Sequence, residues 1–582
     1  MRWMGRYSGY NASAFRRDLV SGLLVGIIAI PLGMAFAIAS GVKPEYGIYT
    51  TIIAGFLISL LGGSRYQIGG PTGAFIPILF AIVMQYGYEN LLVAGFMAGI
   101  LLVLMGIFRL GALIKYFPRP VIVGFTSGIA VIIFTGQISN FLGLHHIDRH
   151  EYFLPNMAEI AAHLADTNVY SVITALICLA IIFVMNKQFP KFPGSLFALV
   201  ITSVIAALFM SGKVETIGTA YGGIPNTLPA FQFPELTWER IVMLIGPAFV
   251  IAMLGSIESL LSAVVADGMT GSRHDSNREL IGQGIANIVT PLFGGIPATG
   301  AIARTATNIK SGAFSPVSGM IHALVVLLVL YLFAPYASHI PMAAIAPILM
   351  IVAWNMSGYK EFLHVLNTKS ADSVVLVITF LLTVFLDLTI AVGFGLVLAI
   401  ILFVKRMSEI LRVTKVLPDP KDDKVREYMV HEGRDCPQIS IFTIEGPLFF
   451  GAANMFEKSI LDSLHMRPKV LLLRMGRVPF MDTTGESNLR SLVTHFQKHG
   501  GTILITGIQE QPLEMLKKTG LYEIIGSKNI FPHTGEAIDT AIGHIDHEKC
   551  IGCKHFAFRE CAQLSSAAEM PSGQPHVTNS SG

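Results

Sequence analysis

From Asp18 to about Val404 this chain consists of one apolar run after another, and that succession constrains its fold more than any other feature. A helix needs about 20 apolar residues to cross the hydrocarbon core of a bilayer. Only 14% of the 582 residues are charged, whereas soluble domains contain about 25% charged residues. Charge returns to an ordinary density after Lys405. The sequence therefore predicts a polytopic, all-α membrane domain followed by a smaller water-soluble domain.

The membrane region contains about fourteen apolar segments, some of them too short to span a bilayer alone. The segments lie near residues 19–39, 47–62, 72–86, 90–108, 121–142, 170–186, 195–211, 241–266, 280–293, 299–309, 317–336, 340–355, 371–386 and 388–404. The residues before them lack the short apolar core and the cleavage site of a secretory signal. We therefore predict that residues 1–17 are a cytosolic segment and that residues 18–406 form the membrane domain.

Basic residues fix the expected topology. With the N-terminus inside, the cytosolic connections hold Arg65, Lys115, Arg119, Lys187, Lys191, Arg273, Arg278, Lys310, Lys360 and Lys369. The opposite connections hold Arg149 and Lys213 and little else. Such a bias is typical of bacterial inner-membrane proteins. We expect a multi-pass protein of the inner (cytoplasmic) membrane with both termini in the cytosol.

Two membrane segments are broken by glycine and proline. Residues 69–75 read GGPTGAF and residues 294–301 read GGIPATGA, about 225 residues later. The same offset carries the first apolar segment onto the eighth. Seven segments followed by seven more give two halves of opposite orientation, because seven is odd. Matched broken segments in inverted halves point to the binding site of a transporter.

An anion suits such a site. Each break starts a half-helix inside the membrane, and its first N–H groups have no partner within the helix. Two half-helix N-termini then present partial positive charge to one point. The alternative is that the breaks are tight bends at which helices pack closely.

Two charged residues lie near this site. Glu258 is midway along the eighth segment, where an acidic group costs about 3 kcal/mol. It either makes a structural hydrogen bond or binds a coupling ion, since a buried carboxyl favours its neutral form. Arg304 lies early in the second half-helix and either contributes positive charge to the anion or extends to the cytosolic interface.

Several ordered motifs resemble the SulP (sulfate permease) family of anion transporters. They are residues 44–50 (PEYGIYT), 70–72 (GPT), 124–128 (GFTSG), 277–280 (NREL), 282–284 (GQG), Asn287, 294–297 (GGIP), Arg304, Asn308 and 315–316 (SP). The resemblance covers residues 15 to about 545. Residues 258–261 (ESLL), 267–271 (DGMTG) and 353–357 (AWNMS) are most similar to a bacterial dicarboxylic acid transporter of this family.

The resemblance implies a seven-plus-seven inverted repeat in which a core domain carries the anion past a gate domain. Segments one to four and eight to eleven form the core. The implied substrate residues are Thr72, Gly73, Ala74, Phe75, Thr299, Gly300, Ala301 and Arg304. The implied coupling residues are Glu258 and Ser262. Sodium-coupled bicarbonate members usually have Asp with a nearby Thr there, so Glu258 with Ser262 favours a proton over sodium. The family also implies a homodimer.

From residue 438 the pattern becomes that of a soluble α/β domain. Strands are expected at 439–444, 470–473 and 502–505, and helices near 452–464, 484–495 and 512–519. This order, at 438–545, resembles a STAS domain, and a linker at 407–437 precedes it. Thr483 and Thr484 match a loop that is phosphorylated in related domains, which implies regulation or a cytosolic partner there. Residues such as Asp482 are also ordinary helix caps.

The tail at 546–582 departs from the family pattern. It contains His544, His547, Cys550, Cys553, His555 and Cys561 around its start. A Cys-x-x-Cys with a nearby His and Cys predicts a zinc site or an iron–sulfur cluster, formed by Cys550, Cys553, His555 and Cys561. The alternative is an unstructured, reduced tail. Its last residues, from Ser565, have a disordered composition.

These observations favour proton-coupled uptake of dicarboxylates such as succinate, fumarate or aspartate, by an elevator-like movement that needs no cofactor. Sulfate or bicarbonate transport, with protons or sodium, remains open. So do a passive anion channel of the same fold and a sensor that signals through its STAS domain. No constellation of nucleophile, base and cofactor predicts an enzyme, and no basic block predicts binding to nucleic acid.

Overall fold

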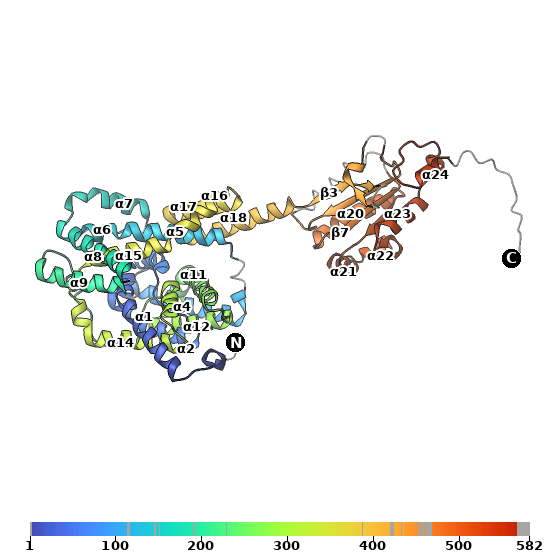
Figure 1. The fold of residues 1–582 in the computed structure, drawn as a ribbon. Coiled ribbons are helices and arrows are strands. Elements are labelled where there is room, and N and C mark those ends of the chain that lie inside the picture. The colour runs from blue at the N-terminus through green and yellow to red at the C-terminus, as the bar shows by residue number, and fades with distance from the viewer. Residues whose placement is uncertain are drawn as a thin grey trace, which may run out of the picture. The chain divides into compact units, whose positions relative to one another are not determined.

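A computed structural model describes residues 3–112, 117–144, 147–150, 152–189, 193–227, 230–386, 388–419, 424–431, 434–451, 456, 460 and 468–566. The chain divides into two compact units, residues 1–399 and 400–582 (Figure 1). This division lies close to Lys405, where the charge density of the sequence changes.

The first unit is helical, and each predicted apolar segment falls on one of a series of helices, the last of which continues into the second unit. They are α1 (Ala12–Ala39), α2 (Pro44–Leu61), α3 (Ile76–Tyr86), α4 (Tyr88–Ile107), α5 (Arg119–Gly136), α8 (Val169–Gln188), α9 (Gly194–Phe209), α11 (Trp238–Thr270), α12 (Ser276–Val289), α13 (Ile302–Lys310), α14 (Val317–Ala337), α15 (Met342–Met356), α17 (Ala371–Phe385) and α18 (Leu388–Ser408). Within the described residues, eight helical segments are long and apolar enough to span a membrane. α3 and α13 are about half that length.

Shorter helices connect or precede these. They are η1 (Trp3–Tyr7), η2 (Gly73–Phe75), α6 (Ile138–Leu142), α7 (Phe153–Ala162), η4 (Leu164–Asp166), α10 (Ile217–Tyr221), η5 (Thr290–Phe293) and α16 (Tyr359–Asn367). Several helices of this unit, long and short, begin with a capped first turn. The carboxamide of Asn11, for example, accepts from the backbone N–H of Ala14 at the start of α1 (2.9 Å).

The long helices form two bundles. In the first bundle α1, α2, α4, α11, α12 and α14 pack on one another, and α3 and α13 belong with them. In the second bundle α5 packs on α17 and α15, and α15 packs on α8 and α9. The two sets can be followed in Figure 1.

The packing repeats between the halves of the sequence. α1 packs on α14 just as α11 packs on α4, and α2 packs on α14 just as α12 packs on α4. In the second bundle, α5 packs on α17 as α15 packs on α8. Exchanging each helix for its counterpart seven segments away therefore reproduces the same contacts, as an inverted repeat requires.

The two broken segments meet in a short strand pair that the sequence did not predict. β1 (Gly69–Gly70) lies antiparallel to β2 (Thr299–Gly300), with Gly69 opposite Gly300 and Gly70 opposite Thr299. The pair satisfies backbone groups that the broken helices leave open. It also fixes the starts of α3 and α13 relative to each other.

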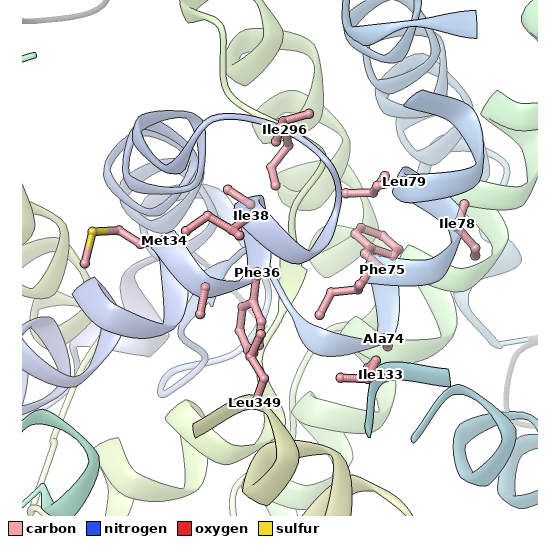
Figure 2. Close-up of a cluster of buried hydrophobic side chains, with 14 of the residues drawn as sticks. Met34, Phe36, Ile38, Ala74, Phe75, Ile78, Leu79, Ile133, Ile296 and Leu349 are labelled. Carbon is pink, nitrogen blue, oxygen red and sulfur yellow. The ribbon is translucent and has the colours of Figure 1, made fainter. Parts of the chain in front are cut away.

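Buried apolar side chains fill the space around the start of α3. Figure 2 shows Phe36 of α1, Ala74 and Phe75 at the half-helix, Ile133 of α5 and Leu349 of α15 in one cluster. Because α5 and α15 belong to the second bundle, this cluster lies where the two bundles meet.

The second unit is built on a five-stranded sheet in the order β3-β6-β7-β8-β9. Its strands are β3 (Arg412–Lys415), β6 (Ile439–Glu445), β7 (Val470–Arg477), β8 (Thr502–Thr506) and β9 (Ile530–Phe531), with a separate pair β4 (Leu417–Pro418) and β5 (Val425–Arg426). β6 to β9 run parallel and β3 is antiparallel. Alternate residues of β7 face two cores: Leu471 and Leu473 lie in one, Val470 and Leu472 in the other.

Helices α20 (Thr483–Lys498), α21 (Glu510–Thr519), α22 (Leu521–Ile525), α23 (Thr534–Gly543) and α24 (Cys561–Ser566), with η6 (Glu427–Met429), η7 (Ser527–Asn529) and η8 (His547–Cys550), complete this unit. The three predicted strands and two of the predicted helices are confirmed. The helix expected near 452–464 lies outside the described residues except for Phe456 and Ile460. The prediction that 407–437 is only a linker is in part wrong. β3 lies within this range and forms the edge of the sheet by pairing with β6.

Candidate functional site

The first half-helix begins at Thr72 without a side-chain cap. Thr72 has extended backbone angles, as an N-cap residue has, yet its hydroxyl makes no cap hydrogen bond. It donates instead to Glu258 Oε2 at 2.9 Å. The first N–H groups of this half-helix are therefore left for another acceptor.

The second half-helix also lacks a side-chain cap, because its N-cap residue is Ala301. The backbone N–H of Ala301 donates to the carbonyl of Ile68 at 2.8 Å, and the N–H of Ile68 donates to the Thr305 hydroxyl at 3.1 Å. These bonds extend the strand pair and hold the two half-helix starts together.

Arg304 connects the two breaks. Its side chain is buried, with 4% exposure, and its Nη2 donates to the carbonyl of Pro71. Its Nη1 is buried and has no hydrogen-bond partner within the described structure. Glu258, half-buried on α11, is close enough to interact with Arg304 electrostatically. Thr72, Glu258 and Arg304 thus all lie around the breaks, and Arg304 does not extend to the interface.

Two positions beside these residues have no room for a side chain and therefore require glycine. Gly70 has a φ of +149°, and a Cβ there would lie 2.8 Å from Arg304 Nη1. A Cβ at Gly300 would overlap the amide of Gln67, whose Nε2 donates to the carbonyl of Ser259 at 3.2 Å. A side chain at either position would displace the groups that hold the strand pair against α11.

Ser262 and Thr299 are part of the scaffold. The Ser262 hydroxyl donates to the Thr305 hydroxyl at 3.2 Å. The Thr299 hydroxyl donates to the carbonyl of Gly255 at 3.1 Å and lies 3.0 Å from the Ser259 hydroxyl. These bonds fasten α13 and β2 to α11. Ser262 therefore contacts α13, whereas Glu258 contacts Thr72.

The start of the first half-helix faces the second bundle. A Cβ at Gly73 would lie 3.7 Å from both Met356 Sδ and Val352 Cγ1 of α15, and 3.8 Å from Ile133 Cδ1 of α5. Phe75, 1% exposed, closes the site toward α11, where a Cβ at Gly255 would lie 3.3 Å from its ring. Ala74 is buried beside it. The substrate residues predicted at 73–75 thus form an apolar wall.

A cavity of about 400 Å³ lies beside the start of α3. Ile76 and Ile133 line it next to the half-helix, and Gln137, Arg149 and His150 line it farther away. Arg149 belongs to a connection that the topology predicts to be external. The cavity is therefore a candidate entrance from outside.

His322 on α14 was missed by the sequence reasoning. Its side chain is fully buried, and neither ring nitrogen has a hydrogen-bond partner in the part of the chain that the structure describes. It lies against Gly55, where a Cβ would be 3.1 Å from its Cε1, and it interacts electrostatically with Arg304. The sequence did carry a signal for His322, because it is a single ionisable residue within an apolar segment.

Asp18 was also missed, and it has a structural role. Its carboxylate accepts from the N–H groups of Phe314 and Ser315 at 2.6 and 3.1 Å, and from the Ser315 hydroxyl at 2.6 Å. It stabilises the N-terminal end of α14. Asn308 is held nearby, donating to the carbonyl of Tyr66 at 2.9 Å.

In the second unit, Asp482 caps α20. Its carboxylate accepts from the N–H of Gly485 at 2.8 Å and from the N–H of Phe450 at 3.0 Å. Thr483 and Thr484 follow in the first turn, and both are exposed. The capping role therefore belongs to Asp482, and the two threonines are accessible at a helix N-terminus.

Cys550, Cys553, His555 and Cys561 line one small pocket of the second unit, together with Cys436. Burial raises the pKa of the Cys436 thiol to about 11, and the thiols of Cys561 and Cys550 contribute to the increase. Within the described residues, no three His, Cys, Asp or Glu side chains already stand in a metal-holding arrangement. The structure thus gathers the predicted residues and adds Cys436 to them.

Two protein-family models match this chain, one in each unit. The sulfate permease family model matches residues 15–379, and the STAS domain model matches residues 433–537.

Relatives extend along nearly the whole sequence. YvdB of Bacillus subtilis, which carries a provisional name as a sulfate transporter, is 57% identical over 536 residues, 92% of this chain and 99% of that protein. The bicarbonate transporter BicA of Picosynechococcus is 30% identical over 545 residues, covering 90% of this chain and 94% of that protein.

Two solved structures are also similar to this chain. The transmembrane domain of a cyanobacterial BicA matches with a TM-score of 0.59 and 31% identity, over 67% of this chain and 98% of that one. Murine Slc26a9, an anion transporter, matches with a TM-score of 0.83 over 93% of both chains, and at 20% identity this likeness concerns the fold. This chain therefore belongs to the SulP (sulfate permease) family of anion transporters, as a multi-pass membrane protein with a C-terminal STAS domain.

Proposed function

We propose that this chain is a secondary active transporter that imports a small divalent anion together with a proton. The anion binds between the N-terminal ends of α3 and α13, and Glu258 carries the proton. The observation that supports this most directly is the hydrogen bond of 2.9 Å from the Thr72 hydroxyl to Glu258. It puts a titratable carboxyl at the start of one half-helix, while Arg304 belongs to the other.

The charges near the breaks favour a divalent substrate. Each helix N-terminus is equivalent to about +0.5 elementary charge, so two of them and the Arg304 guanidinium supply about +2. With Glu258 protonated, this sum balances a divalent anion. With Glu258 ionised, the sum falls to about +1. Binding of a divalent anion therefore favours the protonated carboxyl, and the two travel together.

Sulfate is the first candidate substrate, because the name of the 57% identical relative refers to sulfate. A four-carbon dicarboxylate is the second. It is favoured by the resemblance of residues 258–261, 267–271 and 353–357 to a dicarboxylic acid transporter. Bicarbonate, the substrate in the name of BicA, carries one charge and suits the site with Glu258 ionised.

The transport step is an elevator-like movement of the first bundle along the second. Supporting this, the site belongs to the first bundle, and its wall at Gly73 contacts α5 and α15 through apolar side chains. Apolar contacts without directional bonds allow one surface to slide past the other. The cavity between Ile76 and Arg149 is the external route to the site.

Uptake into proteoliposomes tests this proposal. Radiolabelled sulfate, succinate and bicarbonate are offered with and without an inward proton gradient, to the wild type, Glu258→Gln and Glu258→Asp. We expect the gradient to stimulate uptake of a divalent anion in the wild type and in Glu258→Asp, which keeps a carboxyl, but not in Glu258→Gln. Uptake of bicarbonate alone would contradict the charge argument. Uptake in the wild type that ignores the proton gradient would favour a passive channel.

A further inference from the structure

Four of the five cysteines meet in the second unit. Cys436 lies just before β6, Cys550 ends η8, Cys553 follows after two residues, and Cys561 begins α24. More than a hundred residues separate the first from the others, yet all four line the same pocket and none forms a disulfide. The sequence alone could not join Cys436 to the tail.

Gln438 holds the segment that contains Cys436 against the segment that contains Cys550. Its Nε2 donates to the carbonyl of Asp546 at 2.9 Å and to the Cys550 Sγ at 3.5 Å, and its Oε1 accepts from the N–H of Asp546 at 2.9 Å. Since Gln438 follows Cys436 by two residues, this clamp brings η8 and Cys550 alongside Cys436.

The rest of the tail is fixed on the sheet. Ala557 and Phe558 are buried in the core that contains Ile439 and Leu472, and Cys561 packs against the same core. The Ser565 hydroxyl donates to the carbonyl of Cys553 at 3.1 Å. The cysteines are thus held near one another by contacts that do not depend on the thiols.

A backbone N–H group points at one of the sulfurs. The Cys561 Sγ accepts from the N–H of Phe558 at 3.4 Å. Such a hydrogen bond is typical of the groups that surround metal ligands. Between Cys550 and Cys553, Gly552 adopts a φ of +73°, which turns the chain tightly.

We propose that Cys436, Cys550, Cys553 and Cys561 bind one zinc ion as four thiolates. Four cysteines, two of them spaced Cys-x-x-Cys, are a standard ligand set for structural zinc. The pocket between them has a volume of about 20 Å³, which is space for a single ion or water. The thiols do not yet surround a common centre, so binding requires them to turn inward.

This ligand set differs from the one that the sequence suggests, because Cys436 takes the place of His555. His555 also lines the pocket, and its buried Nδ1 has no hydrogen-bond partner within the described residues. The test must therefore distinguish the two residues. The zinc would fasten the tail to the first central strand of the sheet. Cytosolic thiols remain reduced, which makes a metal a more suitable cross-link there than a disulfide.

The metal content of the full chain tests the site. The protein is purified under reducing conditions, and zinc and iron are quantified for the wild type, Cys436→Ser, His555→Asn and, as a matched control, Cys178→Ser in the membrane. We expect one zinc per chain in the wild type, His555→Asn and Cys178→Ser. In Cys436→Ser we expect affinity to fall by more than about tenfold and zinc to be lost.

A second measurement does not depend on how the variants fold. Metal-stripped wild-type chain is titrated with Co²⁺, and its visible absorption reports tetrahedral thiolate coordination. We expect saturation at one Co²⁺ per chain and displacement by zinc. The absence of both zinc and Co²⁺ binding would overturn the proposal. So would iron in place of zinc, or zinc that is lost in His555→Asn but retained in Cys436→Ser.

Discussion

At the scale of single residues, Arg304 carries the charge on which anion binding depends. It is buried and donates to the carbonyl of Pro71, and one guanidinium nitrogen has no hydrogen-bond partner within the described structure. A buried charge without compensation is costly. An anion between the half-helices would supply the missing partner.

Arg304→Gln should therefore abolish most anion uptake. Removing one partner of a buried charge pair costs about 3 kcal/mol or more, which corresponds to a fall in uptake of at least about a hundredfold. Initial rates of sulfate uptake measure this. Arg119→Gln is the matched control, because Arg119 is an exposed arginine of the same unit. If Arg304→Gln transported like the control, the anion would not bind at Arg304.

Gly70→Ala should impair transport through backbone strain. The φ of +149° is unfavourable for alanine, and the new Cβ would lie 2.8 Å from Arg304 Nη1. The strain costs about 1–3 kcal/mol, and the displaced guanidinium should raise the KM for the anion. Gly268→Ala on α11, where a Cβ meets nothing within 4 Å, is the control. An unchanged KM in Gly70→Ala would show that Arg304 tolerates the displacement.

Part of this site could be predicted from residue type alone. Glu258 and Arg304 are charged residues in apolar segments, and Thr72 follows a Gly-Pro break. Gln67 and Asp18 could not be found, because each binds backbone groups of a distant segment. Spacing along the chain carries no signal for such contacts.

At the scale of elements, the half-helix start and α15 must move past each other if the elevator-like mechanism is correct. A disulfide between Gly73→Cys and Val352→Cys should stop this movement. A Cβ at Gly73 would lie 3.7 Å from Val352 Cγ1, so the two sulfurs are within reach. We expect oxidation to arrest uptake in the double variant and a reductant to restore it. Each single variant is a control, and full uptake by the cross-linked protein would contradict the movement.

Long apolar helices were predictable because each is a continuous run of suitable length. The strand pair β1–β2 was not, because strands of two residues show no periodicity. β3 was also missed, since its partner β6 lies beyond β4 and β5 in the sequence and its residues are only partly buried. The sequence predicted the helix cap at Asp482 as one of two alternatives, and the other was a phosphorylated loop at Thr483 and Thr484.

At the scale of the whole molecule, the repeat explains why one site serves both halves. Exchanging helices between the halves preserves their packing, so the half-helices approach a common point from two related elements. The offset of about 225 residues indicated this repeat. The sequence did not indicate that the tail contributes to the second unit, because its contacts come from distant residues such as Gln438, Ile439 and Leu472.

The central claim, that Glu258 couples a proton to a divalent anion, is tested most directly by proton movement. Proteoliposomes that contain a pH-sensitive dye are given external sulfate at equal pH on both sides. We predict that sulfate entry acidifies the lumen for the wild type and not for Glu258→Gln. Sulfate entry without acidification in the wild type, or equal acidification in Glu258→Gln, would contradict the claim.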